Sequence, residues 1–336
     1  MIFARALRHS LRYALETNDR VILLGEDIAD PYGGAFKITQ GLSTDFPERV
    51  RTTPISEAAI TGIASGLALA GYRPIVEIMF GDFLGLCFDQ IINHISKYEA
   101  MYNGGVTCPV IIRSPSGGGR GYGPTHSQSL EKHFIGIPHL RTVAASLYHD
   151  TRQVFDALLK QTSPVLYVEH KLLYPLHVFD RDDKRLGIAT VNYVGSPGEM
   201  PTLSIDLVPR EQSVATVVAY GYQAEVARRV IERLALESEL FAELLVPAQI
   251  APLDWKPIEE SVAATGALVV VEEGTARWSW GSEIAAEIGS RLFGSLRHPI
   301  TLVSSRADVI PSSRELEAEV LISEDRIEQA LRAVAR

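Results

Sequence analysis

The chain of 336 residues is 46% hydrophobic and 22% charged and carries a formal net charge of −9 at pH 7, a composition typical of a globular protein with about two domains. The negative charge argues against binding to nucleic acid or to an anionic membrane. Cys87 and Cys108 lie among apolar residues without a CxxC motif, and no apolar run reaches the roughly 20 residues of a membrane span, so we expect buried thiols and a cytoplasmic location.

The first part of the chain alternates predicted helices with predicted strands. Helices are expected at 4–17, 58–70, 84–103 and 151–160, with a short one from Gln128, and strands at 21–24, 73–80, 110–113, 142–145 and 165–169. Strands separated by helices favour parallel β-α-β units. Residues 1–180 are therefore predicted to form an α/β domain with a parallel sheet.

Residues 178–212 differ in character, because they are rich in Asp, Gly and Pro and show no helical period. They predict a linker over 181–212 that contains one or two short strands. The alternation then resumes, with strands expected at 214–219, 244–250, 267–272 and 300–304 and helices at 224–236, 258–264, 282–292 and 324–334. Residues 213–336 are predicted to form a second, smaller α/β domain.

Two predicted helices carry more apolar or small-residue surface than one sheet requires. The helix at 84–103 has a wide apolar stripe, and the helix at 58–70 has Gly62 and Gly66 four residues apart, which permits close backbone approach. Both surfaces are interpreted either as intradomain core or as a subunit interface.

Glu57 is the only carboxylate within residues 55–70, a stretch otherwise made of Ala, Gly, Ile, Leu, Ser and Thr. A helix is expected to begin after Ser56, the predicted N-cap, so two interpretations of Glu57 are open. A glutamate in the first turn often only complements the helix dipole. A carboxyl group in an apolar layer is alternatively expected to have a raised pKa and to exchange protons.

A glycine-rich loop at 117–123 precedes His126. A loop histidine is commonly solvated or structural, but titration near neutral pH also suits acid–base chemistry. No helix follows this loop in the frame that phosphate binding requires, so we interpret it as a flexible loop at the entrance of a site. Glu26 and Asp27, at the end of the first strand, are interpreted equally as loop carboxylates or as cofactor contacts.

Several strings resemble one family, in order and with matching spacing from about residue 4 to the end of the chain. They are GEDI (25–28), YGGAFKITQGL (32–42), RTTPISEAAITGIASGLALAGYRPIVEI (51–78), FDQIINHISKY (88–98), IIRSPSGGG (111–119), THSQSLE (125–131), EHKLLY (169–174) and VVVEEG (269–274). The family is the beta subunit of the thiamine diphosphate-dependent decarboxylase component of 2-oxo acid dehydrogenase complexes. Its members include the pyruvate, branched-chain and acetoin enzymes.

The resemblance implies a pyrimidine-binding domain followed by a transketolase C-terminal-like domain. It matches Glu57 to the glutamate that shares a proton with the aminopyrimidine ring of the cofactor, and it matches Ile55 and Phe83 to apolar contacts of that ring. A plain core aromatic is the alternative for Phe83. The resemblance also makes His126 an active-site histidine near the reacting carbon and the lipoyl arm.

The resemblance further implies a partner chain. Thiamine diphosphate needs a divalent ion, and the GDG…N motif that holds it in related folds is missing here. That motif, and with it magnesium, is expected on an alpha subunit, so that the active site forms between the chains of an α2β2 heterotetramer. No metal ligand is expected in this chain.

Some positions depart from the family. Met79 replaces a common glutamine beside the cofactor, and Gly136 replaces a common histidine. Ile111, Gln161 and Ser163 stand where some members bind potassium through Thr, Asp and Asn, which puts a potassium site in doubt. The segment 246–254 lacks the arginine that usually precedes its Pro-Leu-Asp.

The main hypothesis is therefore a beta subunit that, with an alpha partner, decarboxylates a 2-oxo acid and passes the acyl group to the lipoyl group of an acyltransferase. The alternative is a divergent relative of transketolase and pyruvate dehydrogenase in specialised biosynthesis. It would move a two-carbon or acyl unit, for instance from a ketose, to a carrier protein. A non-catalytic assembly subunit is disfavoured because Glu57 and His126 are both present.

Overall fold

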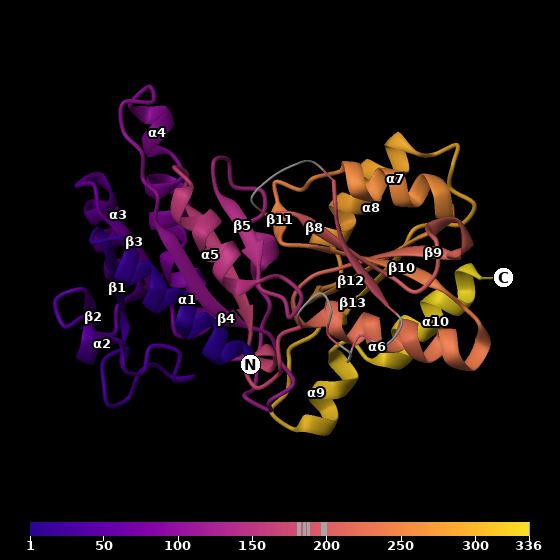
Figure 1. Ribbon diagram of the computed structural model, residues 1–336, viewed down its shortest axis with the longest axis horizontal. Helices are drawn as coiled ribbons and strands as arrows, with labels where there is room; N and C mark the ends of the chain where they lie inside the picture. Colours follow the sequence, from indigo (N-terminus) through magenta and orange to yellow (C-terminus); the bar gives the residue numbers. More distant parts are fainter. Residues whose placement is uncertain (180–182, 184–185, 187–188, 196–199, 336) are drawn as a thin grey trace.

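The computed structural model describes residues 1–179, 183, 186, 189–195 and 200–335, and shows two sheets side by side (Figure 1). The helices are α1 (Phe3–Thr17), α2 (Leu42–Asp45), α3 (Glu57–Leu69), α4 (Tyr98–Met101), α5 (Thr151–Lys160), α6 (Gly221–Ser238), α7 (Lys256–Thr265), α8 (Trp280–Arg291), α9 (Arg314–Val320) and α10 (Glu324–Val334). The strands are β1 (Val21–Glu26), β2 (Val50–Thr53), β3 (Arg73–Glu77), β4 (Ile111–Ser116), β5 (Arg141–Ala144), β6 (Val165–His170), β7 (Thr190–Val194), β8 (Thr202–Asp206), β9 (Ala215–Ala219), β10 (Ala242–Pro247), β11 (Gln249–Ala251), β12 (Leu268–Thr275) and β13 (Thr301–Ser305).

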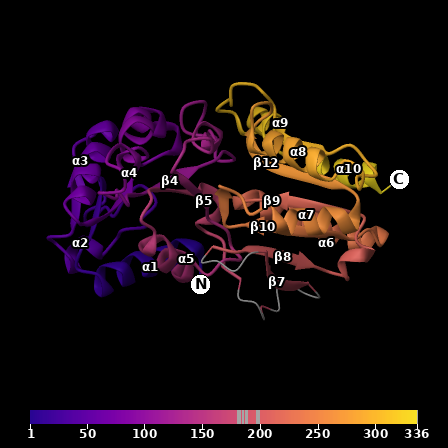
Figure 2. The same ribbon diagram turned by 90° about the horizontal axis from the view of Figure 1, so that it is seen from above.

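The first sheet has the strand order β11-β5-β6-β4-β3-β1-β2 and is parallel except for β11, which pairs antiparallel with β5. Helices α1 and α5 pack on one face, and α3 with the helical segment after β3 packs on the other (Figure 2). In α1 the buried residues Phe3, Leu7, Leu11 and Leu15 recur every fourth position, which gives the helix one apolar stripe. The strands are buried on both faces, as parallel sheets require.

The second sheet has the strand order β13-β12-β9-β10-β8-β7, with β8 antiparallel to both neighbours. One face packs against α6 and α10, and the other packs against α7 and α8. Two sheets with helices on both faces confirm the predicted α/β class. Strands β7 and β8 lie in the segment expected as a linker. Residues 180–182, 184–185, 187–188 and 196–199 of that region lie outside the described residues.

The single α-helix expected over 84–103 is wrong. The segment consists of a 3-10 helix at Gly81–Cys87, a π-helix at Gln90–Ile95 and the short α4. The Ser96 hydroxyl donates to the Ile92 carbonyl (3.2 Å) while its amide donates to Ile91 (3.1 Å). The side chain thus bonds to the carbonyl that the amide of an α-helix would use, and the amide bonds five residues back, which is π spacing.

The short helix expected from Gln128 is also wrong, because only a 3-10 turn at Glu131–His133 forms. The backbone groups of Gln128 are engaged elsewhere, since its amide donates to Asp82 and its carbonyl accepts from Gly117. Helices α2 and α9 and the edge strand β2 are not among the elements expected from the sequence. In the described part of the chain, none of the helices has the length and apolar character needed to cross a bilayer.

Candidate active site

The candidate site lies along the carboxyl edge of the first sheet. Strand β1 ends there at Glu26, β3 leads into Met79 and Phe80, β4 leads into the loop at 117–123, and β6 ends at His170. Parallel strands bring their carboxyl ends to one edge, which is the usual ligand-binding position of such sheets. The residues singled out from sequence therefore meet through topology rather than through proximity in the chain.

Glu57 is the first residue of α3 and is buried beside Glu26. Ser56 is the N-cap, as expected, but its side chain makes no capping hydrogen bond. Burial raises the pKa of Glu26, and the nearby Glu57 raises it further. Oε1 of Glu26 is buried and has no hydrogen-bond partner among the described residues. Two adjacent carboxyl groups in a dry site favour retention of a proton by the pair.

The imidazole of His126 packs against two aromatic rings that also contact each other. It meets Phe80 and Phe83 edge to face, with ring centroids 4.8 and 5.2 Å apart. The Thr125 hydroxyl lies 3.0 Å from Nδ1 of His126, so that this ring nitrogen is engaged by a hydroxyl group. The structure thus brings Phe83 and His126 together, a contact that their 43-residue separation along the chain did not reveal.

The buried thiol of Cys87 lies near both Phe83 and the two carboxyl groups. Its sulfur is 4.0 Å from the carbonyl of Phe83. Burial raises the pKa of Cys87 to about 12, and the charges of Glu57 and Glu26 add to that effect. Burial also raises the pKa of Cys108 to about 11. Both cysteines are free and buried, as predicted, and neither is a thiolate at neutral pH.

The other two predicted contact residues differ in exposure. Met79 is half-buried next to Phe80, whereas Ile55 is 80% exposed in the turn that leads into α3. An isoleucine this exposed beside a buried carboxylate leaves one side of the site open in the single chain.

A buried ion cluster beneath the site was missed from sequence. Arg113 on β4 makes a bidentate pair with Glu169 on β6 (2.8 Å each) and also pairs with Glu77 on β3. The Tyr174 hydroxyl donates to Glu169 (2.7 Å). The sequence did contain a signal for this cluster, because its charged residues stand inside otherwise apolar strands. Such residues are rarely buried without a partner.

A second missed cluster joins the two sheets. Glu273 on β12 accepts hydrogen bonds from Nε2 of His170 (2.9 Å), the Gln223 amide (2.7 Å) and the backbone of Gly118 (2.7 Å). Burial opposes ionisation, but His170 and these hydrogen bonds lower the pKa of Glu273. A cavity of about 400 Å³ adjoins the cluster and is lined in part by Pro124, Gln128 and Ser305.

The described residues contain no group of three or more His, Cys, Asp or Glu side chains that fits a metal ion. Of the three positions matched to a potassium site, two are hydrogen-bonded to arginines. Nη1 of Arg73 donates to the carbonyl of Gln161 (2.6 Å), and Nε of Arg141 donates to the Ser163 hydroxyl (3.1 Å), while Ile111 offers no side-chain oxygen.

Comparison with known proteins places these features in a family. Residues 2–177 match "Transketolase, pyrimidine binding domain" and residues 207–327 match "Transketolase, C-terminal domain". The chain is 36% identical to the pyruvate dehydrogenase E1 component subunit beta of Leifsonia xyli, with 96% of this chain and 91% of that protein covered. It is 32% identical to the beta subunit of the acetoin:2,6-dichlorophenolindophenol oxidoreductase of Cupriavidus necator, with 97% and 95% covered.

Two further relatives extend this picture. The chain is 33% identical to the 2-oxoisovalerate dehydrogenase subunit beta of Bacillus subtilis, with 100% of this chain and 98% of that protein covered. Among solved structures, it is similar to a split gene transketolase described as an inactive beta4 tetramer, with a TM-score of 0.72, 21% identity and coverage of 99% and 98%. At that identity the structural match supports the fold alone.

Proposed function

We propose a catalytic role for this chain, which belongs to the transketolase-like beta subunits of thiamine diphosphate-dependent 2-oxo acid dehydrogenases. With an alpha subunit it would decarboxylate a 2-oxo acid and transfer the acyl group to the lipoyl group of an acyltransferase, in the cytoplasm. The carrier-protein alternative is not favoured, because the relatives compared are dehydrogenase or oxidoreductase beta subunits.

The observation that carries the proposal is the buried pair of Glu57 and Glu26 at the sheet edge that also carries Phe83 and His126. The unpaired Oε1 of Glu26 and the carboxyl group of Glu57 fit an aminopyrimidine, which offers an amino donor and a ring nitrogen to two neighbouring carboxyl groups. When bound, thiamine diphosphate supplies the carbanion chemistry that releases carbon dioxide.

Each residue then has a task of its own. Glu57 would share a proton with the ring nitrogen of the cofactor, and Glu26 beside it, whose pKa is raised by burial and by Glu57, would accept from the amino group. Ile55, Met79 and Phe83 supply apolar surface to the ring. Nε2 of His126 exchanges a proton with the reacting group or with the acceptor sulfur.

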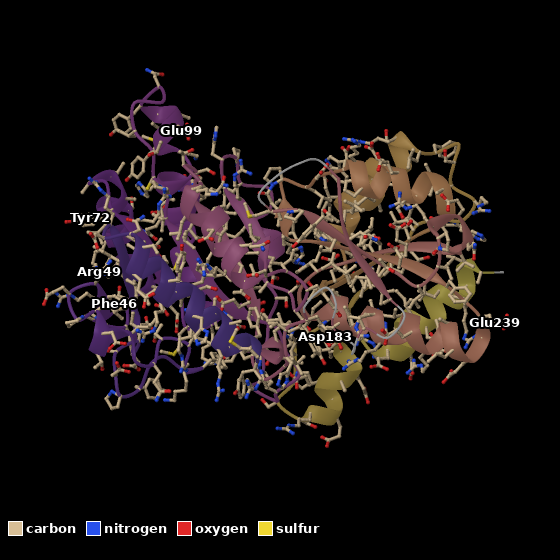
Figure 3. The ribbon with its side chains drawn as sticks, viewed as in Figure 1. Phe46, Arg49, Tyr72, Glu99, Asp183 and Glu239 are labelled. Carbon is tan, nitrogen blue, oxygen red and sulfur yellow. The ribbon has the colours of Figure 1, made fainter. Side chains whose placement is uncertain are left out.

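The outward surface of the first half supports an alpha-subunit partner. Apolar side chains stay exposed there, namely Ile55 (80%), Ile63 (56%), Leu86 (58%), Met101 (61%) and Tyr102 (57%). On α3, a Cβ added at Gly62 or Gly66 would meet open space. Tyr72 and Glu99 mark the outer margin of this half in Figure 3. Exposed apolar side chains together with a helix face open to close backbone approach suit a protein interface, and we assign magnesium and the cofactor diphosphate to the chain that covers it.

The test uses this chain co-purified with an alpha subunit of the same family from the same organism, and the complex is screened against 2-oxo acids and ketose phosphates. We expect a 2-oxo acid to be decarboxylated and a Glu57→Gln variant to lose activity by about 100-fold or more, because an amide cannot donate the shared proton. Glu16→Gln, on the exposed side of α1, is the control for charge loss. Normal decarboxylation by the Glu57→Gln complex would remove the assignment, and turnover of ketose phosphates alone would favour the carrier-protein alternative.

A further inference from the structure

The glycine-rich loop at 117–123 is held by carboxylates from the second half of the chain. The amide of Gly118 donates to Oε1 of Glu273 (2.7 Å), the amide of Gly119 donates to Oε1 of Glu317 (2.9 Å), and the amide of Gly121 donates to Oε2 of Glu317 (2.8 Å). Hydrogen bonds from backbone amides to ionised carboxylates are roughly twice as strong as neutral ones. The loop that sequence patterns predict to be flexible is therefore anchored.

Glycine is required where the loop meets its anchors. Gly117 has φ +87, and a Cβ there would lie 2.0 Å from Nε2 of His170. Gly123 has φ +80, and a Cβ there would lie 2.5 Å from the Ser312 hydroxyl, in the segment just before α9. The loop thus packs directly against His170 at the end of β6 and against the segment that leads into α9, and at both contacts there is room for no side chain larger than hydrogen.

Glu317 lies on α9 and is 2% exposed. Among the described residues its carboxylate is in no ion pair, and it accepts hydrogen bonds from the two loop amides of Gly119 and Gly121. A buried carboxylate is stable only when hydrogen bonds replace its lost hydration. The charge of Glu317 and the order of the loop therefore depend on each other.

The far end of the loop is anchored by a buried cation. Nζ of Lys171, which is 0% exposed, donates to the backbone carbonyl of His126 (2.8 Å) and lies 5.3 Å from the centre of the Phe80 ring. Phe80 is one of the two rings that flank the His126 imidazole. Lys171 thus contacts both the backbone of His126 and the surface on which its ring rests.

We propose that Glu317 and Lys171 are positioning residues, which fix the loop at 117–126 so that the His126 imidazole stays against Phe80 and Phe83. Through Glu317, the C-terminal half would then help to set the geometry of a site whose proposed cofactor residues all lie in the first half. The catalytic consequence rests on the proposed function of His126, whereas the anchoring itself does not.

Hydrogen–deuterium exchange tests the anchoring in the purified alpha–beta complex. Peptides that span 117–126 should exchange about tenfold faster or more in Glu317→Ala, because the two amides lose their charged acceptor. Glu317→Gln, which keeps the volume but can accept only one of the two bonds, should be intermediate. Glu319→Ala removes an exposed charge from the same helix and should exchange like the unmodified chain. Unchanged exchange in both Glu317 variants would overturn the proposal.

Kinetics test the positioning. Glu317→Ala and Lys171→Met should each lower kcat about tenfold with little change in the KM for the 2-oxo acid, since substrate binding does not require the imidazole to be fixed. Glu317→Asp should restore part of the loss. The positioning role would be rejected if kcat stayed unchanged in these variants although the loop exchanges faster, provided that His126→Ala inactivates the complex. If His126→Ala kept full activity, the proposed catalytic role of His126 would be wrong. The hydrogen–deuterium exchange experiment would still decide whether Glu317 anchors the loop.

Discussion

At the scale of single residues, the buried charges carry most of the information. Arg113 is 1% exposed and lies between Glu77 and Glu169, on the three neighbouring strands at the centre of the first sheet. Burial raises the pKa of Glu77 even though Arg113 opposes that effect. Such a cluster adds little net stability when complete, but removal of one member leaves an uncompensated charge.

Arg113→Met should therefore destabilise the chain by about 3–5 kcal/mol, because two buried carboxylates lose their common cation. Denaturant unfolding measures this change. Arg51→Met is the matched control, since Arg51 pairs with Glu48 on the surface and such pairs contribute less than about 1 kcal/mol. A loss for Arg113→Met no larger than that of the control would show that the cluster is not electrostatically coupled.

Glu131 provides a prediction about pH. Burial raises the pKa of Glu131 from 4.5 to about 7, although Ser116 donates to its carboxylate (2.9 Å). Between these values the folded chain keeps a proton that the unfolded chain has lost, so this group lowers stability as pH rises through that window. Glu131→Gln stays neutral and should gain about 3 kcal/mol relative to the unmodified chain between pH 4.5 and 7.5.

Unfolding midpoints of both proteins measured across that pH range test this prediction. Glu16→Gln, an exposed carboxylate on α1, is the control and should follow the unmodified chain. Parallel stability curves for Glu131→Gln and the unmodified chain would contradict the proposed titration.

At the scale of elements, α3 has two distinct faces. Ile60, Ala64 and Ala68 pack against the sheet, whereas Gly62 and Gly66 face open space. A glycine inside a helix costs about 1 kcal/mol relative to alanine. Two glycines on this face of α3 are explained by a partner chain that approaches the helix backbone closely there.

Gly66→Leu should accordingly leave the free chain as stable as before, or more stable by about 1 kcal/mol, yet weaken co-purification with the alpha subunit at least tenfold. Gly294→Leu, which also points into open space but lies in the second half, is the control and should co-purify normally. Undiminished co-purification of Gly66→Leu would place the alpha subunit on another surface.

The helical segment after β3 shows why some elements escape sequence analysis. Its apolar residues recur with helical spacing, which predicted a single α-helix, but this spacing does not show to which carbonyl each backbone amide bonds. At Ser96 the hydroxyl bonds to the Ile92 carbonyl and the amide bonds to Ile91. Likewise β2 is a four-residue edge strand with two exposed residues, so it lacks the apolar pattern that identified its neighbours.

At the scale of the whole molecule, Glu273 links the two halves. Its carboxylate accepts from Gly118, Ser129 and His170 of the first half and from Gln223 of the second. Strand β11 strengthens the link, because it follows β10 of the second sheet in the chain but pairs with β5 of the first. The site thus depends on the mutual position of the two sheets.

Glu273→Ala should destabilise the chain by about 2–5 kcal/mol, because it leaves several buried donors without an acceptor. Denaturant unfolding measures the loss, and Glu283→Ala, an exposed carboxylate on α8, is the control. A loss below about 0.5 kcal/mol would mean that contacts other than those of Glu273 hold the two halves together.

The sequence by itself determined the alternation of helices and strands, the α/β class and the resemblance that selects Glu57, Phe83 and His126, because these depend on local periodicity and on short contiguous motifs. The tertiary structure decided which charges pair, how β11 crosses to the first sheet and how Glu273 and Glu317 hold the glycine-rich loop. Gly121 and Glu317 are 196 residues apart in the chain, and only the packing of the second half against the first brings carboxylate and amide together. Their contact depends on strand order and packing, which no local pattern encodes.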